Sequence, residues 1–227
     1  MSVDTLSVMD EEPGPLTETR TESLTEPLTE SLTGRLRDEA GAAGEAECAR
    51  LASTADREEL ARALVEPGRP LWSRELAAFR LGCAGDRRAF EALVLLLNHR
   101  DPERCVCAAH ALAELRDPRT PRAAAALATN PLRSAYALHP VRLLTALRAP
   151  ESAPALIATL ERLLVPRRPK ADAAPAPEEP HWRVALACVE GLGQLGDDRA
   201  RPVLESALSR PRLSGAAAEA LSRLPAE

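Results

Sequence analysis

The sequence predicts an all-α fold in which about five helical hairpins stack side by side as a solenoid. Hydrophobic residues make up 45% of the chain but aromatic residues only 2%, so the core has to consist of Ala, Leu and Val. This composition suits helices, because sheets rely on aromatic side chains as well as β-branched ones. From residue 46 onward the chain also repeats a unit of about 30 residues, and each unit reads as two amphipathic helices.

The first 45 residues differ from the rest and predict a separate arm. Residues 15–34 read PLTETRTESLTEPLTESLTG, a four-residue repeat in which Thr–Glu recurs beside leucine. Thr forms helices poorly and Pro27 interrupts them, so residues 1–45 are predicted to be a disordered, acidic, Thr/Glu-rich arm. The alternative is a segment that becomes helical on binding, because a spacing of four places the leucines on one stripe of a helix.

The charge of the chain is uneven. Residues 1–50 carry 12 acidic and 4 basic side chains, a net charge of −8, and the remainder carries 22 acidic and 25 basic side chains, a net charge of +3. An acidic arm beside a mildly basic body suggests that the arm occupies the binding groove until a partner displaces it.

Residues 46–227 form the predicted repeat domain, and each of its first helices begins beside an acidic residue. A carboxylate in this position accepts hydrogen bonds from the unpaired N–H groups of a helix start. The gaps between these acidic residues are 30, 31, 34 and 46 residues, and the last gap contains a Pro-rich loop insertion at residues 166–180. The acidic residues are Asp56, Asp86, Asp117, Glu151 and Asp197.

The second helices share the residues that mark their starts and ends, and they also share an apolar face. Pro lies near the start of each, and Gly85 and Gly196 each follow the end of one, where a left-handed residue is commonly required. One face carries small or aliphatic side chains, which let neighbouring second helices approach closely. In the second unit these are Cys105, Ala108, Ala109, Leu112 and Leu115, and in the fourth Ala185, Cys188, Val189, Leu192 and Leu195.

The repeat resembles a known family. The stretches LGQLGDDRARPVLESAL, EPHWRVALACVEGLGQLGD and LGCAGDRRAFEALVLLLNHRDPERCVCAAHALAEL are similar to HEAT repeats of the bacterial type named after phycobilin lyases, and the resemblance covers residues 46–224. It implies a right-handed α-solenoid whose second helices line the concave face. It also implies a ladder of arginines early in the second helices, for which Arg74 and Arg142 match, whereas Ala185 replaces the arginine in the fourth unit.

Residue patterns for catalysis or metal binding are missing from the sequence. None of the four histidines precedes a glutamate, so the His–Glu iron ligands of the related deoxyhypusine hydroxylases are absent. Cys105 and Cys107 point to opposite sides of a helix, which is wrong for one metal ion. We therefore expect no cofactor and no metal, and an enzyme is not favoured. A lyase-type enzyme, or its auxiliary subunit, is the third-ranked alternative.

The function that we expect is a non-catalytic scaffold or adaptor, which binds a protein or peptide along the concave face. An odd number of cysteines and an N-terminus without a signal peptide or a membrane span favour the cytoplasm and no membrane contact. On the helical wheels, the side chains that point away from the core are the candidate partner-binding residues. They are Val106, His110, Glu114, Leu186, Glu190 and Gln194, and Arg142 of the arginine ladder is the further candidate.

The alternative is a nucleic-acid-binding protein of the DNA-lesion glycosylase type, which also consists of HEAT-like repeats. Such a protein needs aromatic side chains to stack on bases and arginines to contact phosphates. The candidate contacts are Trp72, Arg74, Arg104, Trp182 and Arg183, near the starts of second helices. The simpler interpretation, which we favour, is that each Trp packs at a turn and each Arg pairs with a carboxylate.

Overall fold

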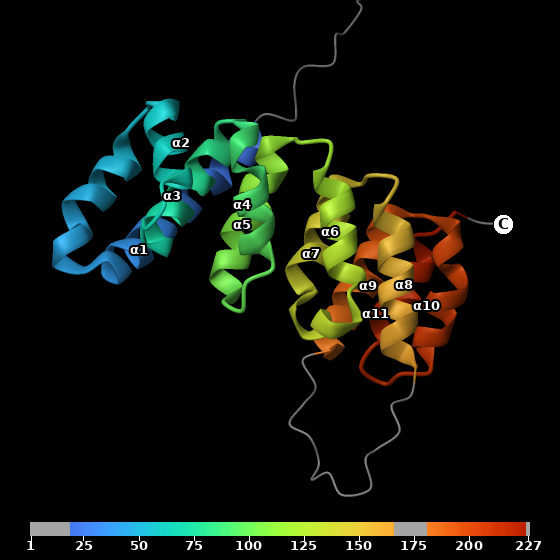
Figure 1. Ribbon diagram of the computed structural model, residues 1–227. Helices are drawn as coiled ribbons and strands as arrows, with labels where there is room; N and C mark the ends of the chain where they lie inside the picture. The colour runs from blue at the N-terminus through green and yellow to red at the C-terminus, as the bar shows by residue number, and fades with distance from the viewer. Residues whose placement is uncertain (1–18, 166–180, 226–227) are drawn as a thin grey trace, which may run out of the picture.

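The computed structural model describes residues 19–165 and 181–225, and every regular element in these ranges is a helix, as the sequence predicts (Figure 1). The α-helices are α1 (Thr19–Ser53), α2 (Arg57–Val65), α3 (Leu71–Cys83), α4 (Phe90–Leu97), α5 (Pro102–Leu115), α6 (Thr120–Thr129), α7 (Leu138–Leu147), α8 (Ser152–Leu164), α9 (His181–Leu195), α10 (Arg201–Leu208) and α11 (Ser214–Ser222). Three short 3-10 helices accompany them: η1 (Arg87–Ala89), η2 (Pro131–Tyr136) and η3 (Asp198–Ala200).

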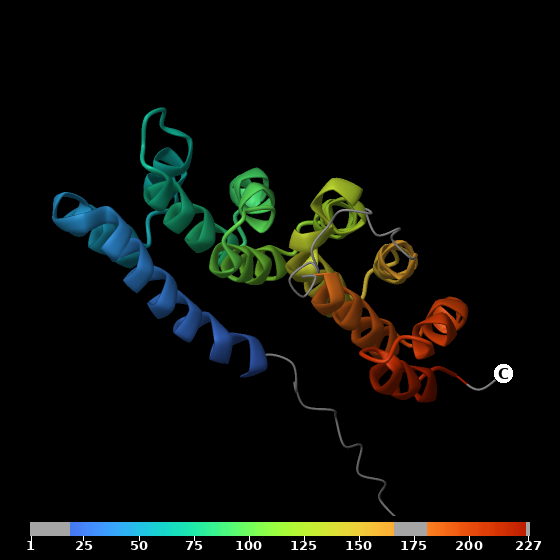
Figure 2. The same ribbon diagram turned by 90° about the horizontal axis from the view of Figure 1, so that it is seen from below.

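From α2 onward, the described helices pair in sequence as five hairpins, α2/α3 to α10/α11. The first helices α2, α4, α6, α8 and α10 form one row, and the second helices α3, α5, α7, α9 and α11 form the other (Figure 2). Each second helix packs against the next one along the chain. The solenoid that the repeat predicts is therefore confirmed.

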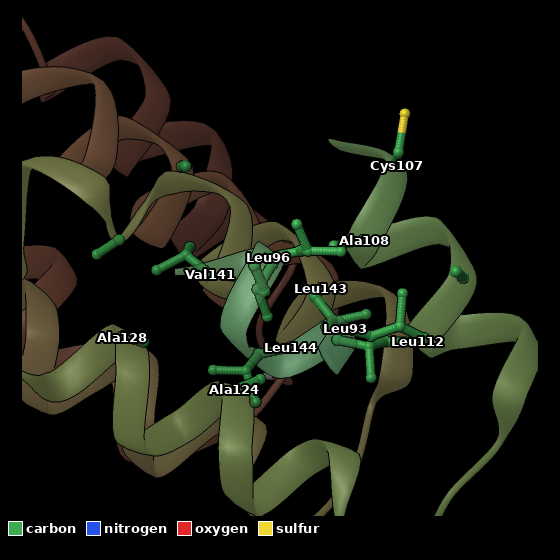
Figure 3. Close-up of a cluster of buried hydrophobic side chains, with 14 of the residues drawn as sticks. Leu93, Leu96, Cys107, Ala108, Leu112, Ala124, Ala128, Val141, Leu143 and Leu144 are labelled. Carbon is green, nitrogen blue, oxygen red and sulfur yellow. The ribbon is translucent and has the colours of Figure 1, made fainter. Parts of the chain in front are cut away.

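The core runs between the two rows and consists mainly of Leu and Ala. Figure 3 shows it where the second and third hairpins meet: Leu93 and Leu96 from α4 and Leu112 from α5 lie close to Leu143 and Leu144 from α7. All five side chains are buried. Burying a leucine contributes about 2 kcal/mol, so these leucines stabilise the packing of the second hairpin against the third.

Four of the five acidic residues predicted to start first helices accept capping bonds, one directly at α2 and three in the turn or 3-10 helix that leads into α4, α6 or α10. The carboxylates of Asp56, Asp86, Asp117 and Asp197 accept hydrogen bonds of 2.8–3.0 Å from the backbone N–H two residues later. Glu151 is the exception, because its side chain makes no capping bond. There Ser152 Oγ accepts a bond from the Ala149 N–H and donates one to the Leu144 carbonyl.

Four of the second helices end at a residue with a left-handed backbone, which is a glycine in two of them and an arginine in the other two. Gly85 and Gly196 have φ angles of 73° and 69°, in the left-handed region, as predicted. The corresponding residues in the second and third hairpins are Arg116 and Arg148, both with a φ of 50°. A side chain in this region costs free energy that glycine avoids, so these two turns are more strained than their counterparts.

The structure differs from the prediction at the N-terminal arm. Residues 19–53 form α1, which breaks at Gly41 (φ 61°, ψ −175°) and packs against α3 and α5. Leu32 of the four-residue repeat and Leu36, four residues later, are fully buried, and Leu28 packs against the core, so leucines spaced by four supply a helical stripe to the core. Burial of this stripe outweighs the low helix propensity of Thr and the interruption at Pro27. The part of the predicted arm before residue 19 and the insertion at 166–180 lie outside the described residues.

Candidate partner-binding surface

α1 covers the second-helix face of the solenoid at its N-terminal end. Buried Glu75 of α3 is the centre of this contact: it accepts a hydrogen bond from Arg35 of α1 and lies 3.2 Å from Nη1 of Arg104 on α5. Arg104 Nη2 also bonds to Glu39 of α1 at 2.5 Å. Burial raises the pKa of Glu75, and Arg35 and Arg104 oppose that rise in part, so the opposite charges join α1 to α3 and α5 at a partly buried cluster.

The same contact removes two of the five candidate nucleic-acid contacts from the surface. Trp72 is 6% exposed, and its ring lies against Gly44 of α1. Arg104 is 8% exposed and belongs to the ionic cluster. Arg74 is exposed and donates to the Arg69 carbonyl at 3.1 Å. A base cannot stack on a Trp that α1 covers. Arg104 pairs with carboxylates, as the simpler interpretation has it, whereas Trp72 packs against α1.

The remaining two members of that set, Trp182 and Arg183, lie in the first turn of α9. Trp182 is half-buried and Arg183 is exposed, with its guanidinium carbon 5.9 Å from the centre of the Trp182 ring. The five residues therefore occupy three different second helices, α3, α5 and α9.

Two of the three candidate residues on α5, His110 and Glu114, lie beside side chains of α3. His110 is half-buried and stacks on Phe79 of α3, with ring centres 6.2 Å apart, and burial lowers its pKa. Glu114, also half-buried, contributes after burial to the rise of the Cys83 pKa to about 12. Val106 is 38% exposed and is the most accessible of the three.

Three predicted residues on α7 and α9 come together in one groove. Arg142 on α7 and Glu190 and Gln194 on α9 are exposed, and they line a hollow of about 220 Å³ between these second helices. Gly191 lies beside it, where a Cβ atom would stand 2.4 Å from Thr145 Oγ1 of α7. A larger residue at position 191 would force the Thr145 side chain to shift, so the glycine lets α7 and α9 approach closely beside the groove. Arg142 and Glu190 give the walls of the groove charges of both signs.

Leu186 was expected to be exposed beside these residues, and this is wrong. Its side chain is half-buried and packs against the core. A helical wheel places Leu186 opposite the main apolar face of α9, but it does not include the neighbouring helices of the stack, which cover it. Residues missed by the wheel include Thr145 and Ala187, which also line the groove.

Clustered metal ligands and reactive thiols are features of many active sites, and both can be assessed within the described ranges 19–165 and 181–225. No group of three or more His, Cys, Asp and Glu side chains is placed to hold a metal ion in these ranges. Burial raises the pKa of Cys107 to about 11 and that of Cys188 to about 12, so these thiols stay protonated at neutral pH and are poor nucleophiles. Among the described helices, none is both long and apolar enough to cross a bilayer.

A comparison with protein families matches residues 184–210 to the PBS lyase HEAT-like repeat. Residues 184–210 are therefore similar to this HEAT-like repeat. The repeat begins in α9, passes through Gly196 and the Asp197 cap, and ends just after α10, so it joins the second helix of one hairpin to the first helix of the next. The family resemblance of the sequence is confirmed in this range. A comparison with curated proteins gave no match.

Proposed function

We propose that the protein is a non-catalytic scaffold, which binds a protein or peptide partner along the second-helix face of α7 and α9. The groove between Arg142, Glu190 and Gln194 carries this proposal, because these exposed side chains converge beside the close contact at Gly191. The opposite sides of both helices are anchored in the core, at Val141 and Leu144 and at Cys188 and Leu192, among others. A partner therefore meets a surface that costs little entropy to order.

The groove suits a protein better than a nucleic acid. Its walls carry Glu190 as well as Arg142, so a phosphate backbone would meet a like charge. The formal net charge of the chain is −5, which gives no long-range attraction for a polyanion. A polypeptide with both acidic and basic side chains can pair with both walls.

We propose the cytoplasm as the location. All five cysteines lie in the described ranges and are free thiols, with none exposed. Such thiols are typical of a reducing compartment, where disulfides are rare.

The test is affinity capture from native cell extract with the full chain as bait, since α1 belongs to the fold. Arg142→Glu and Glu190→Arg reverse one charge each in the groove. Arg122→Glu is the matched control, because Arg122 is exposed on α6, a first helix. We expect a protein that survives nuclease treatment, is retained by the control and is lost with either groove variant. Capture that is indifferent to both groove variants would contradict the proposal, and nucleic acid released by salt would favour the alternative.

A further inference from the structure

A second hollow lies apart from the groove, between the end of α8, the start of α9 and the loop before α11. It measures about 470 Å³, within the usual range for pockets that enclose a ligand group. Leu163 and Leu164 of α8, Ala185 of α9 and Leu213 form an apolar lining. The half-buried ring of Trp182 adds an aromatic surface to this lining.

Arginines surround the mouth of this pocket, which we call the Trp182 pocket. Arg210 and Arg212 belong to its lining, and the guanidinium carbons of Arg212 and Arg183 lie 5.8 and 5.9 Å from the centre of the Trp182 ring. All three arginines are exposed. No acidic side chain is among the described residues that line the pocket.

The backbone adds to the same positive field. α9 begins at His181, and its first two residues, His181 and Trp182, line the pocket. The N-terminal end of a helix carries a partial positive charge from its aligned peptide dipoles. The pocket therefore combines an apolar interior with a positive rim, and its ligand has to combine an apolar group with negative charges around it.

We propose that the Trp182 pocket binds an acidic peptide segment of a partner protein, in which one aliphatic or aromatic side chain enters the apolar interior and flanking carboxylates pair with Arg183, Arg210 and Arg212. This proposal deepens the proposed function, on which it rests, because it assigns a second contact and a ligand class to the scaffold. Arg–carboxylate pairs are directional and charge-assisted, so the rim selects for acidic residues beside the anchor.

A peptide fits these observations better than a nucleic acid. The interior is lined by aliphatic side chains, which suit a single apolar anchor, whereas a strand of nucleic acid requires positive charge along an extended path. That path is interrupted on α9 itself, where Glu190 lies two turns after Arg183. The positive charge of this region is therefore concentrated around one pocket.

The test measures binding of a fluorescein-labelled peptide to the full chain by fluorescence anisotropy. The probe has one leucine between two pairs of glutamates, and two control peptides carry lysine for every glutamate or glycine for the leucine. We expect saturable binding of the acidic probe that weakens with salt, and much weaker binding of both controls. The double variant Arg183→Ala/Arg212→Ala should weaken binding roughly tenfold, since each ion pair at an exposed position contributes about threefold.

Arg122→Ala is the matched control variant, because it also removes an exposed arginine, on α6. It should leave the affinity for the probe unchanged. Equal binding of the probe to the double variant and to the parent would overturn the proposal, as would equal binding of the lysine peptide. If a single-stranded oligonucleotide binds more tightly than the probe and depends on the same two arginines, the pocket serves nucleic acid instead.

The outcome separates this proposal from the proposed function. If the probe fails to bind while extract capture still depends on Arg142 and Glu190, the Trp182 pocket is not a peptide site and the scaffold function stands. If the probe binds but capture is indifferent to the groove variants, the groove proposal fails and the pocket is the contact surface. Trp182→Phe supplies a further check, since it keeps an aromatic ring and should retain most of the affinity.

Discussion

Three turns of the solenoid contain the same short motif, an aspartate followed two residues later by an arginine. In each, the carboxylate accepts the backbone N–H of the arginine and also binds its guanidinium, with Nε–oxygen distances of 2.9–3.0 Å. The hydrogen bond from the arginine side chain is the main reason why the pKa of each aspartate is lowered. The pairs are Asp86–Arg88, Asp117–Arg119 and Asp197–Arg199.

The change Asp117→Asn tests the charge of this motif while keeping an oxygen that accepts the backbone bond. Because the folded-state pKa of Asp117 is lowered, its carboxylate stabilises the fold above its ordinary pKa, and this contribution is lost as the pH falls through the folded-state value. We expect the variant to lose about 1 kcal/mol of unfolding free energy at neutral pH. Urea titrations from about pH 5 to about pH 2 should show the difference shrinking. A constant difference at every pH would mean that the ion pair is not its cause.

Arg116→Gly tests the left-handed turn after α5. Arg116 has a φ of 50° and an exposed side chain, so replacement by glycine removes strain without removing buried contacts. We expect the unfolding free energy to rise by about 0.5–1 kcal/mol in urea titrations. The matched control is Gly85→Ala, which places a Cβ at a φ of 73° in the preceding hairpin and should lower stability by about 1 kcal/mol. No gain in Arg116→Gly would show that the arginine makes compensating contacts.

At the scale of the helices, glycines set how closely second helices approach. A Cβ at Gly193 of α9 would lie 2.7 Å from Cα of Ala220 on α11, and this backbone cannot move aside easily. We expect Gly193→Ala to lower the unfolding free energy by about 2 kcal/mol, although alanine is the better helix former. Gly215→Ala on α11 is the control, because nothing lies within 4 Å of its added Cβ. This control should be neutral or gain up to about 1 kcal/mol. Equal effects of the two changes would contradict the close contact.

The hairpins and their order could be predicted from the sequence because their signals are local. An aspartate cap or a glycine with positive φ acts within a few residues, and these signals recur with the period of the repeat. A helical wheel separates Glu190 and Gln194 from the core side of α9 for a similar reason, and Arg142 follows from its match to the arginine ladder of the family; the structure brings the three side chains to one groove. The Trp182 pocket is lined by three segments, α8, α9 and the loop before α11. A residue pattern within one helix does not show that these segments lie together, so the pocket could not be predicted in this way.

The docking of α1 could not be predicted in the same way. Its main polar contact joins Arg35 and Glu75, 40 residues apart in the chain. Its own composition opposes a helix, and the free energy that stabilises it comes from burying Leu32 and Leu36 against other elements. Tertiary packing thus overrides local propensity in this element.

Leu36→Ala tests this account of α1. Leu36 is fully buried, so the change should lower the unfolding free energy by about 3 kcal/mol through lost burial and a cavity. Hydrogen exchange should accelerate first in α1, because the helix depends on this contact. Ser31→Ala is the control on the same helix, at an exposed position, and should leave exchange nearly unchanged. Retained protection of α1 in Leu36→Ala would mean that the helix is stable without the leucine stripe.

Over the whole molecule, the hairpins form a series in which each contacts mainly its neighbours (Figure 2). The stability of such a stack is approximately the sum of the hairpins and the contacts between them. α1 ends the series on one side, with its leucines inward and Glu30, Arg37 and Asp38 exposed. The terminal element of a repeat stack needs a polar outer face of this kind. α1 therefore shields the end of the stack from solvent in addition to covering the surface of α3 and α5.

The linear arrangement predicts that damage at one end stays at that end. Leu76 of α3 and Leu204 of α10 are both fully buried, and truncating either to Ala should remove about 3 kcal/mol of stability. In hydrogen exchange, Leu76→Ala should lower protection in α2 and α3 while α9–α11 keep theirs, and Leu204→Ala should do the reverse. Each variant is thus the control for the other.

Partner capture gives the second measurement on the same pair. Because the groove between α7 and α9 lies closer to α10 than to α3 in the stack, Leu76→Ala should retain the partner and Leu204→Ala should weaken its binding. If the hydrogen-exchange rate instead rose uniformly along the chain in both variants, the chain would unfold as one cooperative unit. A loss of stability at either end would then weaken partner binding in the groove. If hydrogen exchange and partner capture change only at the mutated end, the C-terminal hairpins keep the shape of the binding surface without help from α1.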